Sequence, residues 1–463
     1  MSGKSTLSLG ARDMDAMLHP TTHIQHHLAK GSKVFTRAEG IHIWDENQNQ
    51  YIEGMSGLWC AALGYGENEL VDAAAKQMHT LSYSHLFSGR SNEPAILLAE
   101  KLKAMAPFAV SKVFFGHSGS DANDTQIKLV WYYNNAIGRP RKKKIISRQR
   151  AYHGVGFGSA SMTALAYSHT GFDLPFAPFL RTRCPHYYRE AEAGESEEAF
   201  SSRLAEELES LILSEDPDTI AAFIAEPLMG AGGVIIPPHG YFEKIQAVLD
   251  RYDILLIDDE VICGFGRTGK MFGAETVHMR PDTMSLAKAL SSGYQPISAV
   301  LIPEIMYQAF LEASESKGVF GHGFTYSGHP VCAAVALKNI ELIEQRGLVA
   351  RAEQLGVHFQ SRLRDFSSHP LVGEARGVGL IGALELVCEK KTRRSFSPGL
   401  AVGADLQARC EQHGLIIRAM GDTIAFCPPL IITETQVDEI FDRFGRALDE
   451  TLTHVRHEIG RAN

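Results

Sequence analysis

Through the middle of the chain, apolar and polar residues alternate between a strand pattern and a helix pattern. Short continuous apolar runs, bounded by turn or charged residues, indicate buried strands, and stretches with helical spacing separate them. Such runs cover residues 112–115, 220–225, 254–257 and 299–302. Strands that alternate with helices in this way are typical of a mostly parallel sheet covered by helices. The pattern therefore predicts an α/β fold.

The two ends of the chain differ from the middle. Asn68 can cap a helix that runs through Leu70 and Met78, whereas the residues before it predict short strands and loops. Near the other end, Thr433 and Gln436 match a capping box ahead of a helix with one apolar face. We therefore expect a boundary at residue 67.

Composition is that of a globular protein that folds throughout. The chain has 463 residues, of which 44% are hydrophobic and 21% charged, and its formal net charge is −9. This negative charge argues against a nucleic-acid partner, and we interpret the basic run at 139–144 as a solvated loop. Seven scattered cysteines without a CxxC pair favour the cytoplasm, and no apolar segment is long enough to predict a membrane span.

One glycine-rich segment imitates a nucleotide-binding loop. Residues 264–270 satisfy G-x-G-x-x-G and most of a P-loop, but Met271 stands where a magnesium-binding hydroxyl is required. Three acids, Asp258, Asp259 and Glu260, precede it where a pyrophosphate would have to approach. These acids suit a cationic partner such as a protonated pyridine, although they could also cap the next turn.

Two further segments could serve a cofactor. Residues 118–125 read as a turn between a strand and a helix, where Gly119 and Ser120 could bind an anion or only cap the helix. Lys288 is a single lysine among apolar and small residues. Burial would keep its amine neutral and nucleophilic, whereas a surface lysine is the alternative.

Taken together, these segments closely resemble the class III aminotransferases, above all the omega-amine:pyruvate type. The resemblance spans nearly the whole chain, and the order and spacing of its motifs are highly specific. The motifs are Ser56-Gly57-Leu58-Trp59-Cys60, Ser118-Gly119-Ser120-Asp121-Ala122-Asn123, Tyr152-His153-Gly154, Glu226-Pro227, Asp259-Glu260-Val261, Gly264-Phe265-Gly266-Arg267-Thr268-Gly269, Ala287-Lys288 and His322-Gly323-Phe324-Thr325-Tyr326-Ser327-Gly328-His329-Pro330. Two mild departures are Asp121, where glutamate is usual, and Cys263, where threonine is frequent.

The resemblance implies a fold-type I enzyme with pyridoxal 5'-phosphate (PLP) as cofactor. Residues 68–330 would form the large domain, and residues 1–67 and 331–463 a smaller α+β domain. Lys288 would form the Schiff base and transfer the proton, and Asp259 would pair with the pyridine nitrogen. The remaining cofactor contacts implied are Tyr152 and Val261 on the two ring faces, Gly119 and Ser120 at the phosphate, and His153 and Glu226 in support.

The resemblance also implies a homodimer and a substrate class. Thr325 would reach the phosphate of the neighbouring subunit, so that the active site is complete only in a dimer. Arg418 matches a mobile arginine that binds the carboxylate of an acceptor such as pyruvate. Trp59, Phe87 and Tyr152 would form aromatic walls for an amine donor with a hydrophobic part, although Trp59 and Phe87 could be core residues.

Other functions remain open at this point. Related class III enzymes act on taurine, putrescine, 4-aminobutyrate or diaminopelargonate, and an inactive binding homologue could keep the fold. The intact Lys288 and Asp259 speak against inactivity. His23, His26 and His27 lack a further ligand at a recognisable spacing, so the sequence predicts no metal site.

Overall fold

A seven-stranded sheet forms the centre of the computed structural model, which describes residues 7–462. The strand order is β4-β10-β9-β8-β7-β5-β6, and only β10 runs antiparallel to its neighbours. The predicted mostly parallel α/β sheet is thereby confirmed. The strands are β4 (Val110–Gly116), β5 (Lys144–Arg148), β6 (Phe179–Thr182), β7 (Ile220–Ala225), β8 (Leu255–Asp259), β9 (Thr283–Leu286) and β10 (Ser298–Pro303).

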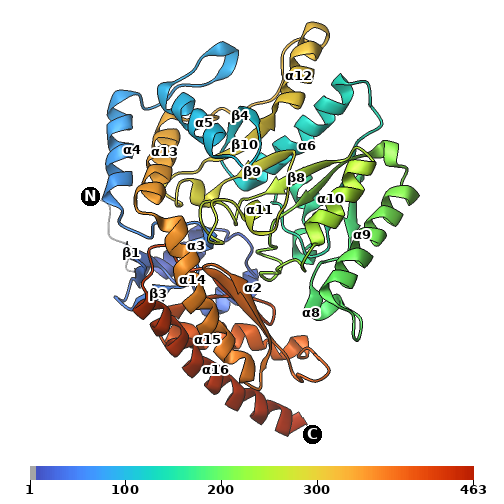
Figure 1. Cartoon of the computed structure of the whole chain (residues 1–463). Coiled ribbons are helices and arrows are strands. Elements are labelled where there is room, and N and C mark those ends of the chain that lie inside the picture. Colours follow the sequence, from blue (N-terminus) through green and yellow to red (C-terminus); the bar gives the residue numbers. More distant parts are fainter. Residues whose placement is uncertain (1–6, 463) are drawn as a thin grey trace.

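Helices cover both faces of this sheet (Figure 1). Along β7, Phe223 and Ala225 pack into one apolar cluster with α9 and α10, whereas Ala222 and Ile224 pack into another with α6. Burial on both faces explains why the strand is apolar throughout. The helices of this region are α4 (Asn68–Thr80), α5 (Glu93–Met105), α6 (Gly119–Ala136), α7 (Phe157–Met162), α8 (Tyr187–Glu190), α9 (Glu197–Ser214), α10 (Tyr241–Arg251), α11 (Gly273–Thr276), α12 (Glu304–Lys317) and α13 (Pro330–Gln345).

The two ends of the chain meet in a second sheet, in which β13 pairs in parallel with β3. A third sheet has the order β11-β12-β15-β14. Blue β1 and β3 lie beside orange and red α14, α15 and α16 in Figure 1. These elements are β1 (Phe35–Glu39), β2 (His42–Asp45), β3 (Gln50–Glu53), α3 (Ser56–Trp59), α14 (Leu348–Asp365), β11 (Val372–Val378), β12 (Ile381–Leu386), α15 (Val402–Gln412), β13 (Leu415–Ile416), β14 (Arg418–Met420), β15 (Thr423–Phe426) and α16 (Glu434–Ala462).

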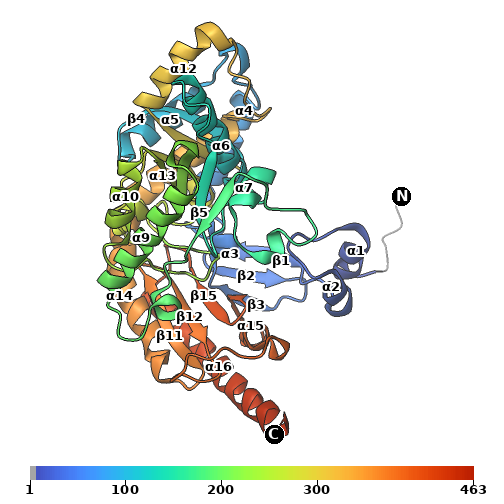
Figure 2. The same ribbon diagram turned by 90° about the vertical axis from the view of Figure 1, so that its right-hand side faces the viewer.

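Two short helices begin the described chain and stand out from the body of the molecule in Figure 2. They are α1 (Leu9–Ala16) and α2 (Ile24–Lys30). Single 3₁₀ turns complete the inventory: η1 (Phe87–Gly89), η2 (Ala166–Ser168), η3 (Pro217–Thr219), η4 (Lys288–Leu290), η5 (Phe366–Ser368) and η6 (Pro398–Leu400). Within residues 7–462, no helix combines the length and apolar character needed to cross a membrane.

The sequence predicted one helix start correctly and two others incorrectly. The Thr433–Gln436 capping box is confirmed, since each backbone N–H donates to the other side chain. The cap at Asn68 is wrong by one residue, because the Glu67 side chain accepts from the Glu69 amide and Asn68 is already helical. Residues 119–125, expected as a turn, are the first two turns of α6.

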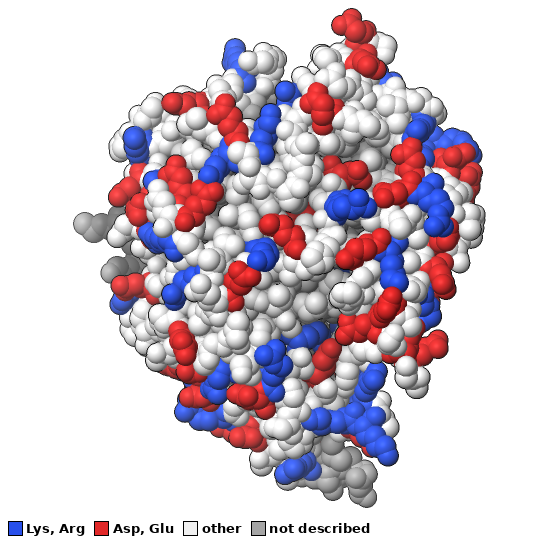
Figure 3. All heavy atoms as spheres, viewed as in Figure 1, with Lys and Arg blue, Asp and Glu red and all other residues white. Residues whose placement is uncertain are grey.

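The basic run at residues 139–144, interpreted above as a solvated loop, makes ion pairs at the surface. Arg139 pairs with Asp253, Arg141 pairs with two aspartates, and Lys144 pairs with Glu215 at 2.8 Å. Three of its five cations are therefore paired with acids, whereas the buried Lys142 donates to the backbone carbonyls of Tyr252 and Asp253. Figure 3 shows acidic and basic side chains interspersed over the face that it presents.

Candidate active site

The carboxyl ends of the parallel strands border one large cavity of about 1250 Å³. Asp259 ends β8, Lys288 follows β9, Glu226 follows β7 and Tyr152 follows β5. In open α/β sheets this edge is where ligands bind, because loops from several strands converge there. The small sheets close the opposite side of the cavity with residues that include Arg418 on β14.

Asp259 is a carboxylate held in place on all sides. It is 3% exposed, and its Oδ2 accepts hydrogen bonds from Asn123 Nδ2 at 2.7 Å and from His153 Nδ1 at 2.8 Å. The Val261 amide donates to its Oδ1 at 3.2 Å. Hydrogen bonds donated to a carboxylate stabilise its charged form. The site thus offers an acid with a fixed orientation at the edge of the cavity.

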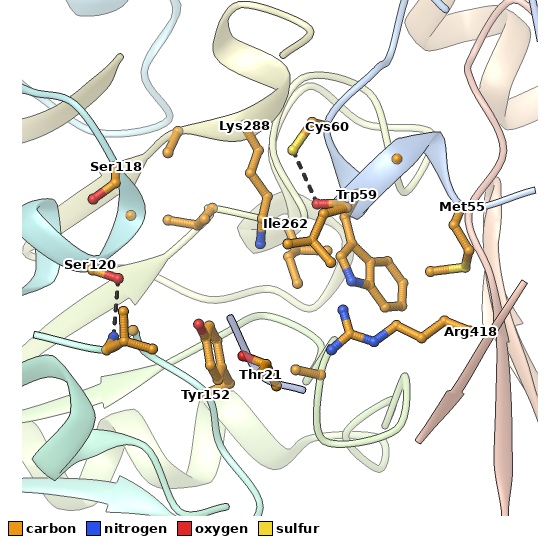
Figure 4. Close-up of a pocket in the computed structure, with 18 of the residues that line it drawn as sticks. Thr21, Met55, Trp59, Cys60, Ser118, Ser120, Tyr152, Ile262, Lys288 and Arg418 are labelled. Atoms are coloured by element: carbon orange, nitrogen blue, oxygen red, sulfur yellow. Dashed lines mark hydrogen bonds between the residues drawn. The ribbon is translucent and has the colours of Figure 1, made fainter. Parts of the chain in front are cut away.

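Lys288 presents a free amine to the same cavity. Its backbone adopts the left-handed conformation with φ +49°, which costs a non-glycine residue about 1 kcal/mol, and this turns the side chain out of the strand direction. Its Nζ makes no hydrogen bond or ion pair with the residues that the structure describes. Burial lowers the pKa of Lys288, which increases the neutral, nucleophilic fraction. In Figure 4 the amine points into the open space above Tyr152.

Glu226 and Tyr152 meet beside these two groups. The Glu226 carboxylate accepts from the amides of Tyr152 at 3.2 Å and Gly230 at 2.8 Å, and it is 3% exposed. Burial raises the pKa of Glu226 and also that of the Tyr152 hydroxyl. Glu226 therefore fixes the backbone that carries the aromatic ring of Tyr152 and the adjacent His153.

The N-terminus of α6 forms a cradle with two glycines at positions that leave no room for a Cβ atom. A Cβ on Gly119 would lie 2.8 Å from Val261 Cγ1, and a Cβ on Gly154 would lie 2.7 Å from Ser120 Cα. The Ser120 hydroxyl accepts from the Val155 amide at 3.1 Å and remains able to donate. The first amides of a helix lack intrahelical acceptors and attract anions, so this cradle suits a phosphate.

Arg418 is the second unpaired cation of the cavity. It is half-buried on β14, and among residues 7–462 its guanidinium has no hydrogen-bond or ion-pair partner. Figure 4 shows it extending from the side opposite Ser120 toward the middle of the cavity, below Trp59. Trp59 is 2% exposed and forms part of the wall. An unpaired guanidinium beside an apolar wall suits a ligand with a carboxylate.

The structure gathers ten of the twelve predicted site residues around this cavity and leaves two outside. Phe87 and Thr325 do not line it; Phe87 is 47% exposed and Thr325 is also exposed. The two lie in one neighbourhood, since a Cβ on Gly323 would touch the Phe87 ring and Tyr83 donates to the Thr325 carbonyl. The ten are Trp59, Gly119, Ser120, Tyr152, His153, Glu226, Asp259, Val261, Lys288 and Arg418.

Sequence reasoning missed other residues of the wall. Arg150 lines the cavity and contacts His186 at 3.3 Å. The only indication of this role in the sequence was its position two residues before Tyr152. Pro20 and Thr21 reach the cavity from the N-terminal segment, where nothing in the polar sequence indicated a role.

The P-loop-like segment and the two residues that depart from the family pattern have structural roles. The P-loop-like segment is a turn in which the Phe265 amide donates to the Met271 carbonyl, and Lys270 pairs with Glu353. Asp121 completes the capping box of α6, and Cys263 is buried. Neither Asp121 nor Cys263 lines the cavity.

The donor set therefore fits PLP: an acid for a pyridine nitrogen, a free lysine, an anion cradle and an aromatic ring around one space. Comparisons with known proteins agree. The family model "Aminotransferase class-III" matches residues 26–448. The chain belongs to the class-III aminotransferases, and it is a PLP-dependent transaminase.

Similar proteins include solved omega transaminases. That of Pseudomonas jessenii in complex with PMP is 54% identical with a TM-score of 0.96, covering 97% of this chain and 99% of that one. A thermostable variant with a tryptophan, a phenylalanine and an arginine replaced, "engineered for asymmetric synthesis of enantiopure bulky amines", is 52% identical with a TM-score of 0.96, covering 97% and 100%. Gamma aminobutyrate transaminase 1 of Solanum lycopersicum is 51% identical, covering 90% of this chain and 81% of that protein.

The cradle yields a test that needs no turnover. Gly119→Ala should weaken PLP binding about tenfold, because its Cβ must push against Val261 and overpacking of this kind costs about 1–3 kcal/mol. Titration of apoenzyme with PLP, followed by absorbance, measures this. Gly399→Ala is the control, since a Cβ there meets nothing within 4 Å. Equal PLP affinity in both variants would show that the cradle does not hold the phosphate.

Proposed function

We propose that this transaminase moves the amino group of a primary amine with an apolar part to pyruvate or a similar keto acid. The observation that carries the proposal is Arg418, an unpaired guanidinium that faces the cavity from the side opposite the cradle. A keto acid offers the carboxylate that this cation lacks within the chain. Apolar amines would pack on Trp59 when the arginine turns away.

Each predicted residue has a defined task in this proposal. When bound, PLP supplies an electron-withdrawing ring that stabilises negative charge on the substrate carbon. Asp259 would keep the ring nitrogen protonated, because its own charge is held by Asn123 and His153. Lys288 Nζ would carry the cofactor, be displaced by the substrate amine, and then move the proton from the substrate carbon.

The remaining cofactor contacts follow from the shape of the cavity. Gly119 and Ser120 would hold the phosphate at the N-terminus of α6, and Tyr152 and Val261 would pack on the two faces of the ring. His153 and Glu226 support these groups through their hydrogen bonds to Asp259 and to the Tyr152 amide. Two half-reactions then share one site, the first releasing the carbonyl product and the second aminating the keto acid.

The exposed pair Phe87 and Thr325 supports a homodimer with shared active sites. In the engineered omega transaminase, the three replaced residues have the same types and spacing as Trp59, Phe87 and Arg418. Two of these line the cavity of a single chain and Phe87 does not. A partner subunit that brings Phe87 and Thr325 to the cavity would complete the substrate pocket and the phosphate site.

Organisation and location complete the proposal. Residues 68–330 would form the large domain, and residues 1–67 with 331–463 the small one, because β3 and β13 join the two ends in one sheet. All seven cysteines are free, which suits the reducing cytoplasm.

The function is tested by following alanine. Incubation with pyruvate and a panel of amines should release alanine, and Lys288→Ala should reduce the rate about 100-fold or more, because the variant has neither tether nor proton carrier. Lys270→Ala is the matched control, being an exposed lysine of the P-loop-like segment. Activity with 2-oxoglutarate and 4-aminobutyrate, without alanine formation from pyruvate, would instead indicate the function in the name of the tomato relative.

The acceptor site is tested at Arg418. Arg418→Ala should raise the KM for pyruvate about 10- to 100-fold, since a charged hydrogen bond contributes about 1.5–3 kcal/mol, with little change in the KM for an amine without a carboxylate. Arg37→Ala, at an exposed arginine of β1, should change neither constant. Steady-state kinetics measures both. Parallel increases of both KM values in Arg418→Ala would contradict a carboxylate-specific role.

The shared site is tested by complementation. Chains with Lys288→Ala lack the essential amine, and chains with Thr325→Asp carry a charge that would repel the phosphate. If Thr325 acts across the dimer, co-expressed heterodimers regain one intact site and therefore activity. Purification through two different affinity tags isolates them. Heterodimers as inactive as the parents would show that Thr325 serves the site of its own chain, and an active Thr325→Asp parent would show that it serves neither site.

A further inference from the structure

The N-terminal segment contributes to the active-site wall although few elements hold it. Helices α1 and α2 stand out from the body of the molecule in Figure 2, and the turn between them carries Pro20 and Thr21 to the cavity. Figure 4 shows Thr21 near Tyr152 and Arg418. What fixes this turn therefore affects the shape of the substrate pocket.

Three side chains of this segment converge on one carboxylate oxygen. His19 Nε2 lies 2.7 Å and His27 Nε2 3.8 Å from Asp13 Oδ2, and the three ligand atoms are all within 4.8 Å of one another. The two imidazole centroids are 4.4 Å apart. Ser32 donates to the same oxygen and lies 3.3 Å from His27 Nε2. The residues come from α1, the turn, α2 and the chain after α2.

We propose that His19, His27 and Asp13 bind a divalent transition metal of the zinc type, with Ser32 or water as the fourth ligand. Zinc takes imidazole nitrogen and carboxylate oxygen at about 2.0–2.2 Å in a tetrahedron, which places neighbouring ligand atoms about 3.3–3.5 Å apart. The distances of 2.7 and 3.8 Å lie on either side of that spacing. Small side-chain rotations therefore suffice to admit the ion.

The charge and exposure of these three side chains also favour a transition-metal ion. Hydrogen bonds from Ser32 and then from His19 lower the pKa of Asp13, so the carboxylate is ionised at neutral pH, as a ligand must be. The side chains of Asp13, His19 and His27 are 17%, 29% and 15% exposed, so the site is sheltered but open to an entering ion. Two neutral imidazoles and one carboxylate select a first-row transition metal over calcium or magnesium.

Neighbouring histidines do not share this arrangement. His23 stacks on His26 at 3.9 Å between centroids, and its Nδ1 accepts from the His26 amide at the start of α2. A second cluster, His186 with Glu374 and Glu385, already contains Arg376 and Arg189, whose charges occupy its carboxylates. Of the clusters in the described chain, the Asp13 site alone combines two histidines with a carboxylate free of arginine or lysine.

A metal at this site would join α1, the turn and α2 into one unit. The turn starts at the ligand His19, so Pro20 and Thr21 would be held at the cavity by a bond one residue away. Without the metal, α1 and α2 are joined by the hydrogen bonds of His19 and Ser32 to Asp13, and their own helical contacts are marginal at 8 and 7 residues.

Cobalt provides the direct test, because tetrahedral Co²⁺ absorbs visible light. The full-length holoenzyme, dialysed against chelator, should bind one Co²⁺ per chain with a Kd of about 10 μM or lower, and Zn²⁺ should displace it. His19→Gln keeps a hydrogen-bond donor for Asp13 and His27→Gln keeps a polar partner for Ser32, but each should weaken binding about tenfold or more. His23→Gln, in the same segment, should bind as the unaltered chain does.

A second measurement reports on the segment itself. Added Zn²⁺ should slow proteolytic cleavage within residues 7–32 severalfold in the unaltered chain and in His23→Gln, but not in His19→Gln. The proposal is overturned if no saturable Co²⁺ site exists below about 100 μM. It is equally overturned if His19→Gln and His27→Gln bind as tightly as His23→Gln, or if metal binding leaves cleavage unchanged.

Discussion

The burial of Asp259 is the constraint around which the large sheet is organised. A carboxyl group that is 3% exposed has lost most of its contact with water, so the protein must supply hydrogen-bond donors, and Asn123 and His153 do so. One donor comes from α6 and the other from the loop after β5, so three segments must meet to satisfy one buried acid. The same helix carries at its N-terminus the cradle that we propose for the cofactor phosphate. The support of the acid and the proposed phosphate site are thus parts of one helix.

The proposed contact with the substrate carboxylate lies in a different part of the molecule. Arg418 belongs to the sheet β11-β12-β15-β14, whereas Lys288 and Asp259 belong to the central sheet. Ion pairs join these units, and one of them connects Arg189 in α8 with Glu385 on β12 at 2.5 Å. Although burial opposes ionisation, Arg376, His186 and Arg189 lower the pKa of Glu385 to about 2. The distance from Lys288 to Arg418 is therefore set by an interface between two sheets. A change at this interface would alter the size of the proposed substrate pocket without disturbing the residues around Asp259.

The sequence predicted best where local pattern and burial agree. The strand at 220–225 was recovered to the residue because both of its faces are buried, and the capping box of α16 because it is a local exchange of hydrogen bonds. The helix start at Gly119 was missed because Gly, Ser and Asp have low helix propensity, yet the capping box of Ser118 and Asp121 overrides that tendency. Most of the predicted residues that line the cavity were named because the family motifs carry them. Thr21 and Arg150 were not, since contacts between distant segments leave no periodic signal.

The parallel pairing of β13 with β3 has a consequence for how the molecule is made. Leu415 lies opposite Ile52, so the sheet that joins the two ends is completed only by residues near the end of the chain. During synthesis, the first strands must wait for almost the whole polypeptide to emerge before they gain their last neighbour. The central sheet, whose strands fall between residues 110 and 303, has no such delay. Ribosomes that stall late would therefore leave a chain that has every strand of the central sheet but lacks Arg418, the residue that we propose for binding the carboxylate of the keto acid.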